Sequence, residues 1–143
     1  MTIQTFLPYP DFKQSVSCLD PDRLGNQIYR EGLTLIRGGW SHHPASKMWK
    51  GYEHALALYC LEGLHELKRR GRIYTLHYAR FRALERYYPD TGLPWWLDDE
   101  RIHLSHQAAL LYKNYNWYIK YNWNTKPAIP NHKGSLPYYW PIQ

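Results

Sequence analysis

The sequence predicts an all-α, compact single-domain fold, and three observations support this prediction. Apolar residues recur at three- and four-residue steps over most of the chain. The chain has 143 residues, which is enough for one real hydrophobic core. It shows no internal repeat and no linker, whereas the prolines near its end exclude a continuing helix. We therefore expect one helical domain over residues 1–143 with an aromatic, extended C-terminal strap.

Residues 42–71 form the longest periodic segment and are predicted to be one helix. Pro44 suits the first helical turn, and Gly71 suits the left-handed position that follows the last turn. The basic run 68–70 suits the negative end of the helix. The residues expected to face the core are Met48, Tyr52, Ala55, Leu56, Tyr59, Gly63 and Leu67.

Lys47 and Lys50 are unexpected in the first turns of such a helix, where the helix dipole already supplies positive potential. One interpretation is a pair of solvated lysines. The other is a phosphate site that the helix N-terminus forms with Lys47, Lys50 and His42 or His43.

A second helix is predicted over residues 21–37, with Asp20 as its cap and Pro21 at its first position. Its neighbouring turns carry the best polar group outside the long helix, namely Arg23, Gln27, Arg30 and Glu31. This group is either an ordinary amphipathic surface or a carboxylate lined by arginines. In the second case the arginines hold phosphates and Glu31 acts on a sugar or base.

The second half of the chain predicts two further helices, separated by a loop over 89–94. The first runs from about 73 to 88. Trp95 and Trp96 precede the other, whose first turn carries acids at 98–100. His103 and His106 share one face of it, but no further metal ligands accompany them, so we expect no metal and a histidine near phosphate or the core.

Composition favours a polyanionic partner. The net charge is +6 and the isoelectric point is about 9.3, while 17% of residues are aromatic and interleave with lysine and asparagine over 112–123. This pattern is typical of a groove that stacks on bases, although several rings are expected to pack the tail onto the helices. Nucleic acid is the first candidate and an anionic membrane surface the second.

The same composition sets expectations about the protein's location and covalent chemistry. No signal peptide or membrane-spanning run is evident, so we expect an intracellular, cytoplasmic protein. Cys18 and Cys60 are too few for a disulfide framework. Thr2 would gain a free α-amine after removal of Met1, which its small side chain permits. An α-amine has a pKa of about 8 against about 10.4 for lysine, so it is a candidate nucleophile.

Short motifs spread over nearly the whole chain resemble the pyrimidine-dimer DNA glycosylase family, also called the endonuclease V type, and more closely its bacterial and phage branch. The matching pieces are Gln4–Phe12, Leu19-Asp20, Arg23-Leu24-Gly25, Gln27, His43-Pro44, Met48-Trp49, Gly51-Tyr52-Glu53, Pro94-Trp95-Trp96, Ser105-His106, Leu136-Pro137-Tyr138 and Trp140-Pro141.

The resemblance implies a compact helical fold and a reaction in two steps. An amine attacks the sugar C1′, expels the base and forms an imine, and the strand then breaks by β-elimination. The family's amine belongs to the residue that corresponds to Thr2, and the nearest match to its glutamate is Glu31. No metal or organic cofactor is implied.

We therefore predict a DNA glycosylase with AP lyase activity that acts as a monomer on damaged or modified pyrimidines in double-stranded DNA. Thr2 is the candidate nucleophile, Glu31 the acid/base and Glu53 the reserve carboxylate. The predicted DNA contacts are Arg23, Gln27, Arg30, His42, His43, Lys47, Lys50, Trp95, Trp96 and His106. We expect positive charge and flat rings to converge on one cleft at the start of the 42–71 helix. The alternatives are a non-catalytic nucleic-acid-binding module and an enzyme acting on a modified base or nucleotide.

Overall fold

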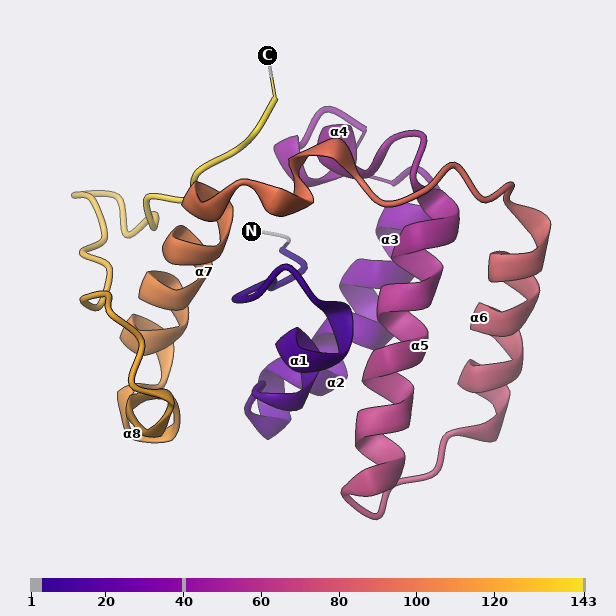
Figure 1. Cartoon of the computed structure of the whole chain (residues 1–143), viewed down its shortest axis with the longest axis horizontal. Coiled ribbons are helices and arrows are strands. Elements are labelled where there is room, and N and C mark those ends of the chain that lie inside the picture. Colours follow the sequence, from indigo (N-terminus) through magenta and orange to yellow (C-terminus); the bar gives the residue numbers. More distant parts are fainter. Residues whose placement is uncertain (1–3, 40, 143) are drawn as a thin grey trace.

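A computed structural model describes residues 4–39 and 41–142, and within these ranges every regular element is a helix. The predicted all-α fold is confirmed. Helices α5 (Glu53–Arg69) and α6 (Thr75–Tyr87) lie side by side at one end of the molecule, and α7 (Glu100–Lys113) and α8 (Tyr115–Tyr118) lie at the other (Figure 1). The N-terminal segment and α1 (Phe12–Ser17) lie between them. No helix in the described ranges has the length and apolarity needed to cross a membrane.

Helix α5 is the centre of the core. It packs against α1 and α6, and Leu56, Tyr59 and Cys60 are fully buried along it. The Tyr59 hydroxyl donates to the carbonyl of Phe6 (2.8 Å), which anchors the N-terminal segment to this helix. Burial of the apolar face of α5 is therefore coupled to the position of the first described residues.

The predicted helix over 21–37 is present as three consecutive elements, α2 (Pro21–Asn26), the π-helix η1 (Gln27–Gly32) and α3 (Leu33–Ile36). This helix approaches α5 closely because small residues lie at the contact. A Cβ atom on Gly63 would lie 2.2 Å from Ile28 Cδ1, and one on Gly32 would lie 2.5 Å from Cys60 Sγ. Glycine's poor helix propensity is thus offset by close packing of the two helices.

The prediction of one helix over 42–71 is wrong, because the segment forms α4 (Pro44–Trp49) and α5 with a break between them. Lys50 is extended with ψ 125°, and Gly51 has φ +87°, a conformation that glycine adopts readily. The Glu53 carboxylate accepts the Gly51 N–H (2.7 Å) and secures the turn. Lys47 is consequently in the last turn of α4, where a lysine is electrostatically favourable, and the argument for a phosphate site at this helix N-terminus fails.

The C-terminal strap is extended beyond η3 (Ile119–Tyr121), as the prolines predict. Part of its aromatic content packs the tail. The Trp123 ring stacks on Tyr118 and Tyr121 with centroids 5.7 and 5.6 Å away, and its Nε1 donates to the Tyr9 hydroxyl (2.7 Å). These rings are therefore engaged in the fold. Tyr112 remains half exposed.

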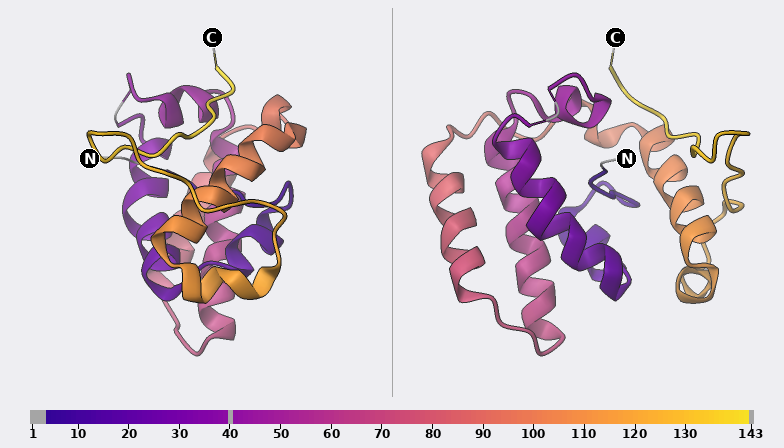
Figure 2. Two further views of the ribbon diagram at one scale, coloured as in Figure 1. Left: turned by 90° about the vertical axis from the view of Figure 1, so that its left-hand side faces the viewer. Right: turned by 180° about the vertical axis from the view of Figure 1, so that it is seen from behind.

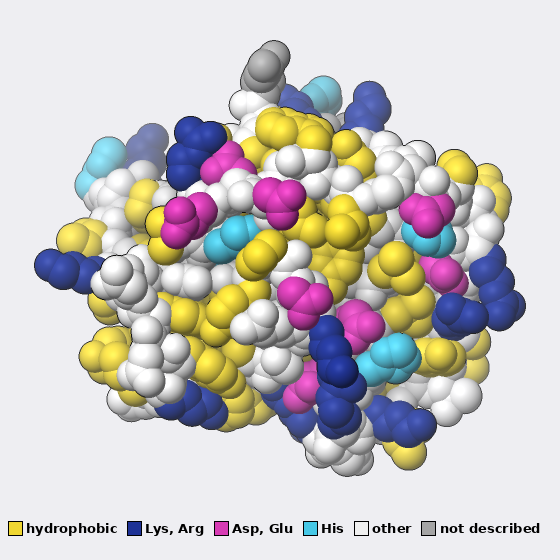
Figure 3. Space-filling model, in the orientation of Figure 1, with side chains coloured by type: hydrophobic (Ala, Val, Ile, Leu, Met, Phe, Trp, Pro, Cys, Tyr) yellow, Lys and Arg dark blue, Asp and Glu magenta, His cyan; other side chains and the backbone are white. Residues whose placement is uncertain are grey.

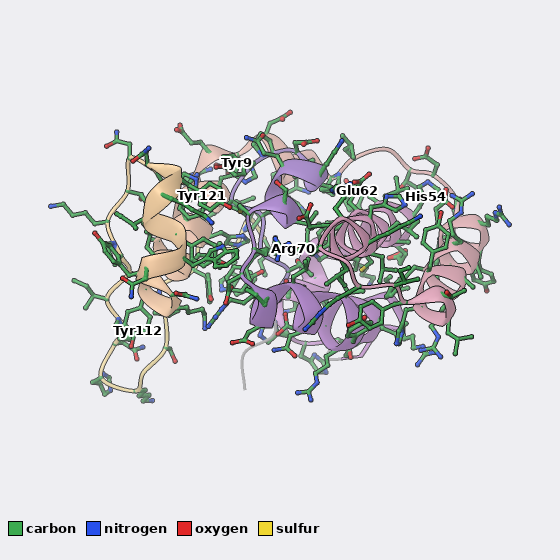
Figure 4. All side chains as sticks on the ribbon, turned by 90° about the horizontal axis from the view of Figure 1, so that it is seen from below. Tyr9, His54, Glu62, Arg70, Tyr112 and Tyr121 are labelled. Atoms are coloured by element: carbon green, nitrogen blue, oxygen red, sulfur yellow. The ribbon has the colours of Figure 1, made fainter. Side chains whose placement is uncertain are left out.

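Arg70 joins the helices at the lower end of the molecule. Its Nε donates to Glu66 (2.9 Å) and its Nη2 donates to the Ser17 carbonyl (3.1 Å), while its guanidinium lies 5.9 Å from the centre of the Trp117 ring. Figure 4 shows Arg70 in the middle of this end, with Tyr9 and Tyr121 toward the side of α8. The C-terminal end of α5 is thereby tied to α1 and to α8.

Candidate active site

A polar hollow of about 210 Å³ lies where four segments meet: the N-terminal segment, α2 with η1, the end of α7 and the strap. The right panel of Figure 2 shows the α2–α3 helix crossing the front of the molecule with α7 and the strap beside it. The residues that line the hollow are Gln4, Phe6, Asp22, Arg23, Asn26, Gln27, Glu31, Lys113 and Tyr138.

Glu31 is held in this hollow by the N-terminal segment and by Gln27. Its Oε2 accepts the backbone N–H of Gln4 (3.1 Å) and the side-chain amide of Gln27 (2.5 Å). The other amide atom of Gln27, Oε1, accepts the N–H of Phe6 (2.8 Å). Because Gln27 bonds in both directions, the Glu31 carboxyl and the first described residues form one hydrogen-bonded unit.

The environment of Glu31 suits proton transfer near neutral pH. Burial raises the pKa of its carboxyl to about 7, against the opposing effects of the hydrogen bonds from Gln4 and Gln27 and of the positive charge on Lys113. A carboxyl with such a pKa is present in both protonation states at neutral pH. It is therefore able to donate a proton in one step and accept one in the next.

Gln4 contributes an unsatisfied donor to the same hollow. The residue is 2% exposed, and its Oε1 accepts the N–H of Thr5 (3.0 Å). Its Nε2 is buried without a hydrogen-bond partner among the described residues. Buried donors are normally paired, so this amide is suited to an oxygen atom of a ligand.

Arg23 is positioned by a buried anion. Asp20 is 1% exposed, and its Oδ2 lies 2.9 Å from Nη1 of Arg23. The same carboxylate accepts the Tyr118 hydroxyl and, more weakly, the amide of Asn114 (3.4 Å). Arg23 is thus fixed at the rim of the hollow, whereas Arg30 is exposed and does not line it.

Six residues of the hollow were not among the predicted site residues, namely Gln4, Phe6, Asp22, Asn26, Lys113 and Tyr138. Lys113 and Tyr138 come from the last third of the chain, and only the tertiary fold brings them to Glu31. Gln4 belongs to a motif that carries the family resemblance, so that motif was the available signal.

The expectation of one cleft at the start of the long helix is wrong, because the predicted residues are divided between separate hollows. Lys47, Lys50 and Glu53 line a second hollow of about 440 Å³ with Trp49 and Tyr88. This hollow is larger than the one around Glu31. The Glu53 carboxylate, however, already accepts the Gly51 N–H and secures the turn there. Glu53 and Glu31 therefore do not form a catalytic pair.

The two tryptophans differ sharply. Trp95 is 70% exposed and shares a shallow hollow with Lys47, Pro141 and Ile142. Trp96 is 1% exposed, and its Nε1 donates to the Met48 carbonyl (2.9 Å). Of these two rings, Trp95 is the one that is available to stack on a base.

The histidines also have different environments. His42 is exposed, and His43 Nδ1 accepts the N–H of Ala45 (3.0 Å) as the cap of α4. His106 is fully buried, its Nδ1 accepts the N–H of Leu7 (2.8 Å), and burial lowers its pKa to about 3. His106 is consequently neutral and holds the N-terminal segment, out of reach of DNA in this conformation.

Charge is spread over the face of the molecule that Figure 3 shows. On the face seen in Figure 3, lysine and arginine side chains lie toward the rim and the lower edge, whereas acidic and hydrophobic side chains occupy the middle. This face does not present one continuous basic patch.

The remaining predictions concern the nucleophile, a metal site and the cysteines. Thr2 lies outside the described residues. Across residues 4–39 and 41–142, no cluster of three or more His, Cys, Asp and Glu side chains has the arrangement of a metal site. Cys18 and Cys60 are both buried free thiols.

Comparisons with known proteins indicate the family to which the chain belongs. No curated protein and no solved structure matches the chain. A family model described as pyrimidine dimer DNA glycosylase matches residues 3–81, which include Gln4, Arg23, Gln27 and Glu31 but neither Lys113 nor Tyr138. Because this match covers more than half of the 143 residues, the chain belongs to the pyrimidine dimer DNA glycosylase family.

Proposed function

We propose that this protein is a DNA glycosylase with AP lyase activity, acting on damaged or modified pyrimidines in double-stranded DNA. Family membership implies a DNA substrate. The observation that carries the proposal is the hollow in which Glu31, with a pKa of about 7, faces the cations Arg23 and Lys113. The two cations suit the negatively charged DNA backbone, and the carboxyl suits a reacting sugar.

In the proposed first step an amine nitrogen attacks C1′ of the damaged nucleotide. The N–C1′ bond forms and the glycosidic bond breaks, and the base leaves with the electron pair and takes a proton from Glu31. The nitrogen then gives a proton to O4′ as the C1′–O4′ bond breaks, which opens the sugar ring and leaves the protonated imine. In the second step the Glu31 carboxylate removes a proton from C2′ of the imine, and the C3′–O bond breaks with the phosphate as leaving group. Water then hydrolyses the imine and returns the amine.

The other side chains have supporting roles in this proposal. Gln27 orients Glu31 by its hydrogen bond, and Arg23 holds a phosphate at the rim of the hollow. Trp95, which is exposed, fills the space left by an extruded nucleotide. Arg30, His42, Lys47 and Lys50 are exposed and contact phosphates further along the duplex. Thr2 is the amine that the family resemblance implies, provided that Met1 is removed.

The size of the hollow limits what enters it. A volume of about 210 Å³ is below the roughly 300–1,000 Å³ of typical pockets for drug-sized ligands. One sugar-sized group fits this space, and a whole dimer does not need to enter. We therefore propose that the protein acts on an extruded or distorted nucleotide. We also propose that it works as a monomer inside the cell.

The test uses duplex DNA that carries either a cyclobutane pyrimidine dimer or an abasic site. We expect base release from the first, strand cleavage at both, and a covalent protein–DNA adduct after borohydride reduction. Glu31→Gln, which keeps an acceptor for Gln4 and Gln27, should slow cleavage by about 10²–10⁴-fold while binding persists.

Two other outcomes would replace the proposal. Salt-sensitive binding without cleavage or adduct would identify a nucleic-acid-binding module. Binding of free nucleotides without binding of duplex would identify an enzyme that acts on a modified base or nucleotide.

A further inference from the structure

Lys113 is the one side-chain amine among the described residues that line the hollow of Glu31. It is the last residue of α7 and lies beyond residues 3–81, which the family model matches. The opposite wall carries Gln27 and Glu31 from η1. An amine and a carboxyl from distant parts of the chain thus face one small cavity.

The acids around Lys113 leave its amine available. Within the described ranges no carboxylate lies within the 4 Å of an ion pair with it. Asp20 is near enough to affect Lys113 electrostatically, but its carboxylate is already engaged by Arg23 and Tyr118. The lysine nitrogen is therefore not neutralised by a fixed partner.

The electrostatic environment raises the fraction of this amine that is in the reactive, neutral form. Lys113 is exposed at the surface, but its partial desolvation beside the hollow lowers its pKa, the positive charge of Arg23 lowers it further, and Glu31 and Asp20 oppose the shift. A lower pKa increases the neutral fraction of a lysine at physiological pH, which activates it as a nucleophile.

A second feature beside the cavity is a buried hydrogen-bond donor without a partner among the described residues. The buried Nε2 of Gln4 has no partner among the described residues, and Gln4 lines the same hollow as Lys113. A sugar hydroxyl, ring oxygen or phosphate oxygen between these residues would satisfy this donor.

We infer that the ε-amine of Lys113 forms the imine with C1′ of the sugar, in protein that retains Met1 as well as in protein that has lost it. This inference rests on the proposed function. At an abasic site the neutral amine adds to the C1′ aldehyde, the N–C1′ bond forms, and water leaves to give the protonated imine. Glu31 supplies the proton that departs with this water and then takes the C2′ proton for β-elimination.

A phosphate contact is the competing role for Lys113, and two variants distinguish the roles. Lys113→Arg keeps the positive charge but removes the nucleophile, so it should abolish the adduct and strand cleavage while binding to abasic duplex changes little. Lys113→Cys should also be inactive. Aminoethylation of that thiol with bromoethylamine should restore the adduct, and since Cys18 and Cys60 are buried, the reagent acts mainly at position 113.

The deciding experiment is borohydride trapping on abasic duplex, followed by protease digestion and mass spectrometry of the modified peptide. We expect the sugar remnant on Lys113 in the full chain and in Thr2→Gln, whose large residue at position 2 should retain Met1. Lys126→Arg, an exposed lysine that does not line the hollow, is the matched control and should behave as the parent protein. Circular dichroism melting would verify that each variant is folded.

The failures of the two proposals differ. A remnant on the N-terminal α-amine, together with full trapping by Lys113→Arg, would overturn the inference and leave the glycosylase function standing. Absence of any adduct or cleavage with the full chain, with or without Met1, would overturn the proposed function and this inference with it.

Discussion

Replacing Glu31 by glutamine should make the protein more stable at neutral pH. The folded protein raises the pKa of this carboxyl from an ordinary 4.5 to about 7, because burial disfavours its charge. Below about pH 4.5 the carboxyl is protonated in both folded and unfolded chains, so it does not affect the free energy of unfolding. Between about 4.5 and 7 only the unfolded chain releases the proton easily, which favours unfolding.

The size of the effect follows from the shift. One pKa unit corresponds to about 1.4 kcal/mol, so a rise from 4.5 to about 7 lowers the free energy of unfolding by roughly 3 kcal/mol once the pH exceeds 7. This loss develops as the pH rises from about 4.5 to about 7 and then stays constant. Glutamine has no proton to release and keeps an acceptor for the N–H of Gln4.

Urea unfolding at pH 4.5, 6 and 8 provides the assay. The difference in unfolding free energy between Glu31→Gln and the parent should grow by up to about 3 kcal/mol across this range. Glu100→Gln, an exposed carboxylate in the first turn of α7, is the control and should give a nearly constant difference. A constant difference for Glu31→Gln as well would refute the burial argument and remove its support for acid–base catalysis.

Three further predictions concern packing and DNA contact. Gly63→Ala would bring a Cβ atom to 2.2 Å from Ile28 Cδ1 and should cost about 1–3 kcal/mol in urea unfolding, whereas Gly25→Ala, with nothing within 4 Å, should stabilise by up to about 1 kcal/mol. Trp96→Ala should lose about 3–5 kcal/mol of stability because the ring is buried in the core. Trp95→Ala should leave the melting temperature nearly unchanged but weaken binding to abasic duplex by about 1–3 kcal/mol in a fluorescence titration, and equal affinity would exclude stacking.

Local signals were sufficient for the helix that carries Glu31. Asp20 and Pro21 mark its start, and the structure places its helical residues at 21–36 against the predicted 21–37. Arg23, Gln27 and Glu31 belong to consecutive turns of this one helix, so short-range geometry brings these three residues to the same hollow. Arg30 belongs to the same segment but is exposed, because the π-helical geometry and the packing of η1 determine which side of this helix faces inward.

The long helix shows where the sequence pattern misleads. Met48 and Leu56 are both buried, so the apolar periodicity continues across a break that it does not reveal. The missing information was the conformation of Gly51, which has φ +87° and lies in the break between α4 and α5. Lys47 then lies in the last turn of α4, where the helix dipole favours a positive charge. Its presence there therefore no longer indicates a phosphate site.

The role proposed for Lys113 could not be inferred from the sequence, because Lys113 and Glu31 line one hollow although more than 80 residues of chain separate them. It lies in a segment rich in lysine, asparagine and aromatic residues, and nothing local separates it from Lys120, which lies 4.2 Å from the centre of the Trp117 ring. The distinction arises from the position of α7, whose end meets the hollow of Glu31.

The position of Glu31 depends on its neighbour Gly32 and on the surface of α5. A side chain at residue 32 would meet Cys60 Sγ at 2.5 Å and the Gln27 carbonyl at 2.9 Å, so only glycine lets the π-helical segment approach α5 so closely. A larger residue would push η1 away from α5 and shift Gln27 and Glu31 with it, since both belong to η1. Such a shift would break the hydrogen bonds that hold Gln4 and Phe6 to this segment. Packing between two helices therefore sets the catalytic geometry proposed for this protein. The π-helical segment, a feature often found at functional sites, contributes to that packing.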